Sequence, residues 1–141
     1  MNWYLQAVLE KYADFSGRAR RTEFWMFTLF NFLFLIAAAI IDKISGSNIN
    51  SLFGDSTYIF PEHFPHYTHV GFIYVLYALA IIIPSLAIKV RRLHDVGKSG
   101  FFLLLVLIPV IGFIVLLVFM LMDSNFGFNK WGPNPKGFGI D

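Results

Sequence analysis

The sequence predicts an all-α membrane protein in which three transmembrane helices follow an amphipathic helix at the membrane surface. Of the 141 residues, 57% are hydrophobic and 18% are aromatic, which leaves too little polar surface for a water-soluble globule of this size. Three uncharged apolar runs of 18, 19 and 22 residues follow one another along the chain. At about 1.5 Å per residue, each run is close to the length that crosses a hydrocarbon core of about 30 Å. Buried core helices of soluble proteins have shorter apolar runs, so that class is excluded.

Residues 1–23 are predicted to form a cytoplasmic segment at the membrane interface. In "NWYLQAVLEKYADF" the apolar and aromatic residues recur at helical spacing and leave the charged residues on another face. Trp3, Tyr4 and Tyr12 suit the level of the lipid headgroups. A helix that packs on the protein's own spans fits the same pattern equally well, and both arrangements keep the segment at the surface.

The predicted transmembrane helices are residues 24–41, 70–88 and 101–122. Pro109 and Gly112 divide the third run, which can therefore cross the membrane once with a kink or return as a re-entrant hairpin. A single kinked crossing is favoured, because irregular backbone in the middle of a membrane must be covered by protein or line a water-filled cavity. The side of the membrane that holds the polar tail, residues 123–141, depends on this choice.

The basic residues predict the orientation of the spans. Eight of the eleven lysines and arginines lie in residues 1–23 or 89–100, whereas the segment 42–69 has only Lys43. Because positively charged short loops stay in the cytoplasm, the N-terminus and the basic loop 89–100 are predicted to be cytoplasmic and the loop 42–69 external. The whole chain, residues 1–141, is thus expected to be one multi-pass domain.

The function predicted from the basic segments is binding, without catalysis and without a cofactor. One cytoplasmic surface is expected to bind anionic lipid headgroups or an acidic segment of a protein partner, with Glu23 and Asp95 orienting its arginines. The surface consists of Arg18, Arg21, Arg91, Arg92 and Lys98. A homo-oligomer or another membrane protein is a further expected partner. Nucleic acid is excluded, because membrane topology already accounts for the charge and no nucleic-acid-binding motif accompanies it.

Two other classes of function stay open. "LHDVG" contains His94 and Asp95, a pair that can act as acid and base, and this favours a membrane-embedded enzyme that acts on a lipid or phosphorylated substrate. The same pair has a structural interpretation, because Gly97 and Gly100 suit a left-handed helix end and a tight turn, and Asp95 can pair with a neighbouring arginine. The other class, a small channel or transporter subunit, requires oligomers, because the three spans have no buried charge to line a pore.

The external loop has a weak metal-site pattern. His63, His66 and His69 recur at every third position. Pro61 and Pro65 favour a polyproline II conformation, which separates the aligned side chains by about 9 Å, too far for imidazole bonds of about 2.1 Å to one ion. Solvated histidines are therefore the favoured interpretation. The chain has no cysteine, so neither a disulfide nor a thiolate ligand is expected.

Three stretches of the sequence resemble one known family. They are "FSGRARRTEFW" (15–25), "RRLHDVGKSGFFLLLVLIPVIG" (91–112) and "GFNKWGPNPKG" (127–137). They are similar to the domain of unknown function 805 family, the YhaH-like small bacterial inner-membrane proteins. Besides the arginines, His94 and Asp95, the matching positions include Gly17, Glu23, Trp25, Gly97, Gly100, Asn129, Gly132 and Pro133, whereas Phe102 stands where tryptophan is usual. The resemblance implies a multi-pass protein of the bacterial inner membrane and implies no particular activity, substrate or cofactor.

Overall fold

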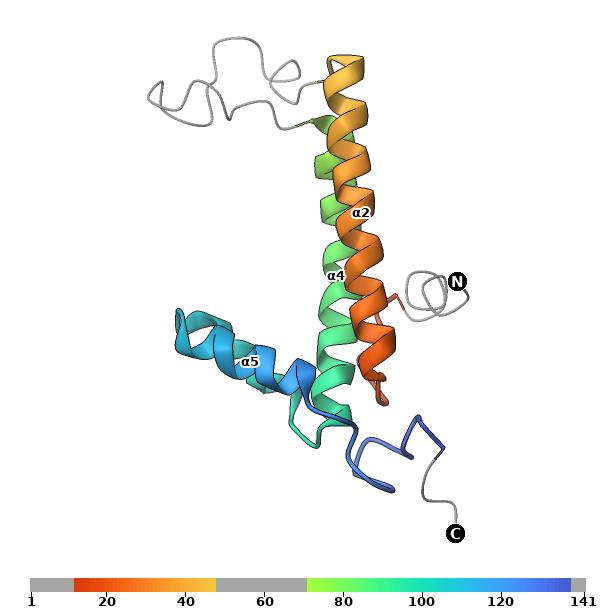
Figure 1. Ribbon diagram of the computed structural model, residues 1–141, viewed down its shortest axis with the longest axis vertical. Helices are drawn as coiled ribbons and strands as arrows, with labels where there is room; N and C mark the ends of the chain where they lie inside the picture. The colour runs from red at the N-terminus through yellow and green to blue at the C-terminus, as the bar shows by residue number, and fades with distance from the viewer. Residues whose placement is uncertain (1–11, 48–70, 138–141) are drawn as a thin grey trace. The chain divides into compact units, whose positions relative to one another are not determined.

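The computed structural model describes residues 12–47 and 71–137. These residues form four helices, which are α2 (Arg21–Ser45), α4 (Phe72–Asp95), the 3-10 helix η2 (Gly100–Leu107) and α5 (Ile111–Leu121) (Figure 1). No strand occurs among the described residues, in which Asn129 and Gly132 form an isolated bridge. The described part of the chain is therefore helical, as predicted.

Helices α2 and α4 have 25 and 24 residues and are long and apolar enough to cross a membrane. They include nearly all of the first two predicted spans. Among the described residues, no third helix reaches this length. The predicted interfacial helix lies almost entirely outside the described residues. The three external histidines, His63, His66 and His69, lie entirely outside them. The chain divides into two compact units. One unit consists of residues 1–29 and 83–141, and the other consists of residues 30–82.

In the unit of residues 30–82, a carboxylate from one helix caps the other helix. Asp42 is buried near the end of α2, and its two oxygens accept hydrogen bonds from the backbone N–H groups of Ile73 at 3.1 Å and Tyr74 at 2.8 Å. These groups belong to the first turn of α4, whose N–H groups have no partner within the helix. Farther along the pair, the hydroxyl of Tyr77 donates to Oδ1 of Asn31 at 2.6 Å. The two helices are thus joined by polar contacts at two levels within this unit.

Helix α4 extends beyond the predicted span and takes in most of the predicted basic loop. The sequence from residue 89 to Asp95 contains neither glycine nor proline, so nothing stops the helix there. Gly97 has φ 76° and terminates the helix. The N–H of Gly97 donates to the carbonyl of His94 at 3.1 Å, and the N–H of Lys98 donates to the carbonyl of Leu93 at 2.8 Å. This is the Schellman pattern. The predicted left-handed helix end at Gly97 is confirmed.

The third apolar run folds back on itself. Pro109 follows the end of η2, and Val110 takes φ 66° and ψ −66° while the N–H of Ile111 bonds the carbonyl of Pro109 at 2.8 Å. This is a γ-turn of the rare form, which reverses the chain within three residues. Gly112 lies against the carbonyl of Leu105, where a Cβ atom would collide with it.

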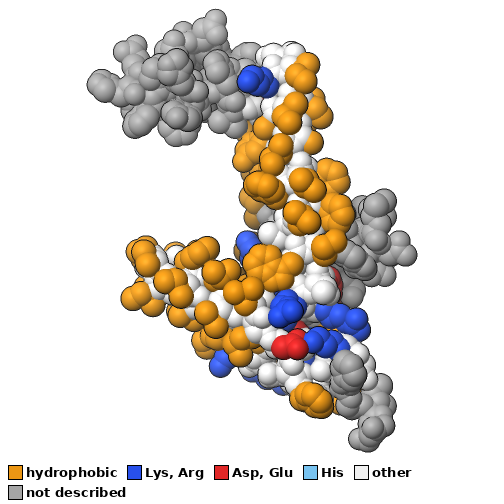
Figure 2. All heavy atoms as spheres, in the orientation of Figure 1, with side chains coloured by type: hydrophobic (Ala, Val, Ile, Leu, Met, Phe, Trp, Pro, Cys, Tyr) orange, Lys and Arg blue, Asp and Glu red, His pale blue; other side chains and the backbone are white. Residues whose placement is uncertain are grey.

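Helices η2 and α5 therefore pack against each other as a hairpin (Figure 1). The single kinked crossing predicted for residues 101–122 is not formed, because Pro109 and Val110 reverse the chain where a kink was expected. The hairpin is apolar on all sides. Its most exposed large side chains are Phe101, Leu104, Val106, Leu107, Val110, Ile111 and Phe113. Figure 2 shows hydrophobic side chains covering the visible face of the hairpin and Lys and Arg side chains gathered beside it.

Candidate functional site

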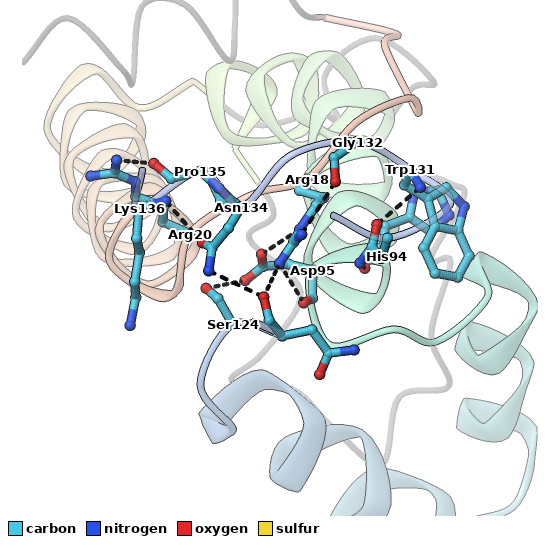
Figure 3. Close-up of polar contacts among 12 residues, drawn as sticks. Arg18, Arg20, His94, Asp95, Ser124, Trp131, Gly132, Asn134, Pro135 and Lys136 are labelled. Carbon is cyan, nitrogen blue, oxygen red and sulfur yellow. Dashed lines mark hydrogen bonds and ion pairs between the residues drawn. The ribbon is translucent and has the colours of Figure 1, made fainter. Parts of the chain in front are cut away.

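The carboxylate of Asp95, the last residue of α4, is the centre of a buried polar cluster. Its Oδ1 accepts a hydrogen bond from Nε of Arg18 at 3.0 Å (Figure 3). Its Oδ2 accepts from Nη1 of Arg92 and from the hydroxyl of Ser124. The three charged side chains are almost completely buried. We call Arg18, Arg92, His94, Asp95, Ser124 and Asn129 the Asp95 cluster.

Arg18 connects three segments that are far apart in the sequence. Besides Nε, its Nη1 donates to the carbonyls of Gly127 at 2.9 Å and Gly132 at 3.3 Å. Its Nη2 donates to the carbonyls of Asn125 at 2.6 Å and Asp95 at 3.3 Å. A guanidinium has five N–H donors, and all five are used here. Arg18 therefore cross-links the segment before α2, the end of α4 and the tail after α5.

Two arginines cap the last turn of α5. Arg92 donates from Nε to the carbonyl of Met120 at 3.4 Å and from Nη2 to that of Met122. Arg21 donates from Nη1 to the carbonyl of Leu121 at 3.3 Å. The last carbonyls of a helix have no partner within it and form its negative end, so cations stabilise it. The end of an otherwise apolar helix is thereby attached to the Asp95 cluster.

His94 is fixed by two flanking segments. Its Nδ1 lies 3.2 Å from the carbonyl of Gly17, which requires Nδ1 to carry the proton, and its ring stacks on Trp131 with the centroids 4.4 Å apart. Gly17 has φ 74°, a conformation that favours glycine. The carbonyl of His94 accepts from Nδ2 of Asn129 at 2.9 Å. His94 thus joins the segment before α2 to the tail, as Arg18 does.

The tail holds its shape through two asparagines. Asn129 and Gly132 exchange backbone hydrogen bonds of 3.1 and 3.0 Å, and Oδ1 of Asn129 accepts from the N–H of Trp131 at 2.9 Å. Such side-chain bonds to the backbone two residues on are typical of asparagine in turns. The amide of Asn134 donates to the carbonyl of Asn125 at 3.1 Å. These bonds present the tail carbonyls to Arg18.

One ion pair of the tail lies at the surface. Nζ of Lys136 contacts Oδ1 of Asp123. The hydrogen bond from Lys136, followed by that from the backbone N–H of Ser124, holds the pKa of Asp123 below its usual value. Asp123 is exposed, so the pair contributes little to stability.

The stretches that meet in the Asp95 cluster belong to a family match that covers most of the chain. The family described as "Protein of unknown function (DUF805)" matches residues 12–133. The chain belongs to the DUF805 family. "Inner membrane protein YhaI" of Escherichia coli (strain K12) is 42% identical over 136 residues, which cover 96% of this chain and 97% of the relative. "Inner membrane protein YhaH" of the same strain is 35% identical over 136 residues, which cover 96% and 98%. No solved structure matches the chain.

The DUF805 relatives and the two long apolar helices together confirm the predicted membrane class. Hydrogen bonds in the structure give the three family stretches a shared structural role. Gly17 and Arg18 come from the first stretch, His94 and Asp95 from the second, and Asn129 from the third. Hydrogen bonds join Arg18 to Asp95, His94 to the carbonyl of Gly17, and Asn129 to the carbonyl of His94. The DUF805 patterns therefore mark the polar cross-links of one structure, although they are separate in the sequence.

Other DUF805 positions support the local structure. The ring of Trp25 meets that of Phe24 edge-on at 5.3 Å. Gly100 begins η2 beside Val90, whose side chain would be crowded by a Cβ atom at this position. Pro133 is exposed and directly follows the turn that Asn129 and Gly132 close. Trp25 and Gly100 thus each lie against a neighbouring side chain.

The five cations predicted to bind lipid or a partner do not form one exposed surface. The side chains of Arg18, Arg91 and Arg92 are buried. Arg21 is exposed, and Lys98 is partly exposed. The charge pattern of the sequence identifies these residues as one group, but the fold turns three of them inward.

The predicted orienting carboxylates do contact these arginines. Asp95 pairs with Arg18 and Arg92, and Oε1 of Glu23 lies 3.6 Å from Nη1 of Arg91. Lys98 has a different environment, because its Nζ lies over the rings of Phe102 and Phe119 at 5.8 and 5.6 Å from their centroids. Aromatic rings attract a cation at this distance through their negative faces.

His94 and Asp95 both make contacts with other segments of the chain. Both carboxylate oxygens of Asp95 accept hydrogen bonds within the cluster, and His94 lies between Gly17 and Trp131. Among the described residues, no group of three His, Cys, Asp or Glu side chains is placed to hold a metal ion. The residues that sequence reasoning missed are Ser124 and Asn125. They lie in an irregular polar stretch after α5, and the acceptor of Asn125 is a backbone carbonyl, which leaves no side-chain signature.

Proposed function

We propose that this DUF805 protein is a non-enzymatic, multi-pass protein of the bacterial inner membrane whose cytoplasmic end binds anionic phospholipid headgroups. The observation that carries the proposal is an exposed apolar hairpin with cations at its base. Arg21 lies at the last turn of α5, and Lys98 lies over one ring of each hairpin arm. Apolar arms favour hydrocarbon, while cations next to them favour the anionic headgroups that border it.

The lengths of the two arms support insertion into one leaflet. Helix η2 has eight residues, and α5 has eleven. At about 2.0 Å per residue for a 3-10 helix and about 1.5 Å for an α-helix, each arm is about 16 Å long. This is about half of a hydrocarbon core of about 30 Å. We therefore propose a re-entrant hairpin beside two transmembrane helices.

The cross-links of Arg18 support the same topology. Arg18 precedes α2, Asp95 ends α4, and Asn125 follows α5, yet they are joined by direct hydrogen bonds. A direct contact cannot extend across a bilayer, so these three segments belong on one side of it. With the tail on that side, ten of the eleven lysines and arginines share it, and only Lys43 is opposite. This asymmetry favours the cytoplasm for the shared side, the N-terminal segment included.

Cations that reach the surface supply the attraction for anionic headgroups. Arg21 and Lys98 flank the hairpin, and the exposed Lys89 directly follows the uncharged run that ends at Ile88. Each cation near an anionic surface contributes about 1 kcal/mol. Association with a second copy of the chain or with another membrane protein is a separate expectation, which lipid binding by these cations does not require.

The re-entrant topology predicts a specific labelling pattern. The chain has no cysteine, so single variants can be labelled without background. With a membrane-impermeant maleimide, Lys130→Cys is expected to react in inside-out vesicles and not in intact spheroplasts. Lys43→Cys is expected to show the reverse, and serves as the control for the external face. Reaction of Lys130→Cys in intact spheroplasts would show that the third run crosses the membrane.

The lipid preference is tested with two matched lysine variants. Lys98→Gln and Lys43→Gln each remove one charge, the first at the hairpin and the second at the far end of α2. After exchange against vesicles of equal phosphatidylglycerol and phosphatidylcholine, the retained ratio of the two lipids is measured by mass spectrometry. We expect Lys98→Gln to lower this ratio about fivefold, the equivalent of about 1 kcal/mol, and Lys43→Gln to leave it unchanged. Equal ratios in wild type and Lys98→Gln would refute lipid binding at the hairpin base.

A further inference from the structure

Arg91 is a buried arginine whose donors are largely unused. Its side chain is 2% exposed, and Nη1 forms the 3.6 Å ion pair with Glu23. Within the described part of the chain, neither Nε nor Nη2 has a hydrogen-bond acceptor. A buried donor without a partner is costly, and more so when it is charged, so such a group in a native protein requires an explanation.

The two unused nitrogens define the chemistry of the missing acceptor. Nε–H and one N–H of Nη2 lie on the same edge of the planar guanidinium and point in the same direction. Two parallel donors of this kind match two oxygens of a phosphate or carboxylate group. The neighbouring arginines differ in this respect, because Arg18 uses all five donors and Arg92 uses both of the corresponding nitrogens.

The place of Arg91 in α4 favours phosphate. Arg91 is three residues beyond Ile88, the last residue of the uncharged run. At about 1.5 Å per residue, it lies about 4.5 Å past the end of the hydrocarbon, within a headgroup layer of about 5 to 7 Å on each side. Its partner Glu23 is 22% exposed, so the ion pair lies just beneath the surface. In the proposed topology, this depth is that of the lipid phosphates.

Trp25 is not part of the same site. Its Nε1 is also buried without an acceptor among the described residues. However, Trp25 is two positions after Glu23 on α2, and residues two apart point about 200° from each other around a helix. The phosphate-facing edge is therefore assigned to Arg91 alone.

We propose that Arg91 binds one phosphate group in a bidentate manner through Nε and Nη2. The group comes from a phospholipid headgroup or from a soluble phosphate ester. The inference rests on the proposed function only in placing Arg91 at the membrane surface. It does not depend on anionic lipid, because zwitterionic phospholipids have the same phosphate.

The test observes the arginine Nε–H groups directly. The chain has five arginines, so a spectrum of ¹⁵N-arginine protein in an uncharged maltoside detergent is expected to show five Nε signals. The full-length protein is titrated separately with dihexanoyl-phosphatidylcholine and with inorganic phosphate at equal concentrations. We expect the Arg91 signal to shift while those of Arg18 and Arg92 stay in place. A shift with the short-chain lipid alone identifies a lipid phosphate, and an equal shift with inorganic phosphate identifies a soluble one. No shift with either probe overturns the proposal.

Arg91→Lys is the informative variant, because it keeps the charge and removes the two-donor edge. We expect it to bind the shifting probe at least tenfold more weakly, and we expect Lys43→Gln, a charge loss in the last turn of α2, to bind it as wild type does. Equal binding by Arg91→Lys and wild type overturns the proposal. If Arg91→Lys does not fold, a through-bond correlation assigns the Arg91 Nε signal in the wild-type protein. The titration of the wild-type protein then tests the proposal. The readout uses phosphatidylcholine, so loss of the phosphatidylglycerol preference would refute the proposed function and leave this result intact.

Discussion

Replacing Asp95 by alanine is expected to lower the free energy of unfolding by about 3 to 5 kcal/mol. The carboxylate accepts hydrogen bonds from Arg18, Arg92 and Ser124 in a buried site. Its removal leaves two buried guanidiniums without a counter-charge, and this is more costly than the loss of one exposed ion pair. Chemical unfolding of the full chain in detergent micelles, followed by circular dichroism, measures the change.

The exposed Asp123 provides the matched control. It also pairs with a cation, Lys136, but both side chains reach solvent. We expect Asp123→Ala to unfold as wild type does within the error of the measurement. An Asp95→Ala protein as stable as Asp123→Ala would mean that the Asp95 cluster is not the cross-link inferred from its geometry.

The two long helices could be predicted because membrane insertion depends on composition over a long run. Uncharged runs of 18 and 19 residues mark α2 and α4 without any knowledge of packing. The end of α4 was also predictable, because Gly97 tolerates the left-handed conformation that a helix terminus requires. In both cases the determining interactions are local in the sequence.

The inward direction of the arginines could not be predicted from the sequence. Counting basic residues assigns Arg18, Arg91 and Arg92 to one side of the membrane, but it does not distinguish a buried side chain from an exposed one. The acceptors of Arg18 and Arg92 are mainly backbone carbonyls, such as that of Gly127, which any residue type could supply. The closing of this cluster depends on long-range contacts, and a single sequence has no pattern that reports them.

The fold of the third apolar run was also only partly predictable. Pro109 predicts a break in the helix, but a break is compatible with both a kink and a reversal. The reversal depends on the unusual conformation of Val110, the close approach of Gly112 to Leu105 and the attachment of the tail to Arg18. Two of these three features are tertiary contacts.

Leu107→Lys is expected to destabilise the protein by about 2.5 to 3.5 kcal/mol in lipid bicelles. Leu107 is the last residue of η2 and is 76% exposed, so within a water-soluble protein this change would cost less than about 0.5 kcal/mol. In the proposed topology, however, the residue is at the tip of an arm of about 16 Å and lies near the middle of the bilayer, where a lysine loses its hydration. Steric trapping, which couples unfolding to the binding of a bulky label, measures the unfolding free energy within the bicelle.

Phe126→Lys gives the comparison that isolates the effect of the lipid. Phe126 is an apolar residue, as Leu107 is, and its side chain is 86% exposed. It lies in the tail after α5, outside the hairpin. We expect this variant to retain wild-type stability, because in the proposed topology its exposed side chain lies outside the bilayer. Equal losses in both variants would place the tail in lipid as well, and no loss in either would remove the hairpin from the membrane. A large loss at Leu107 alone requires that η2 and α5 enter the bilayer together and that the chain after α5 returns to the side from which they entered.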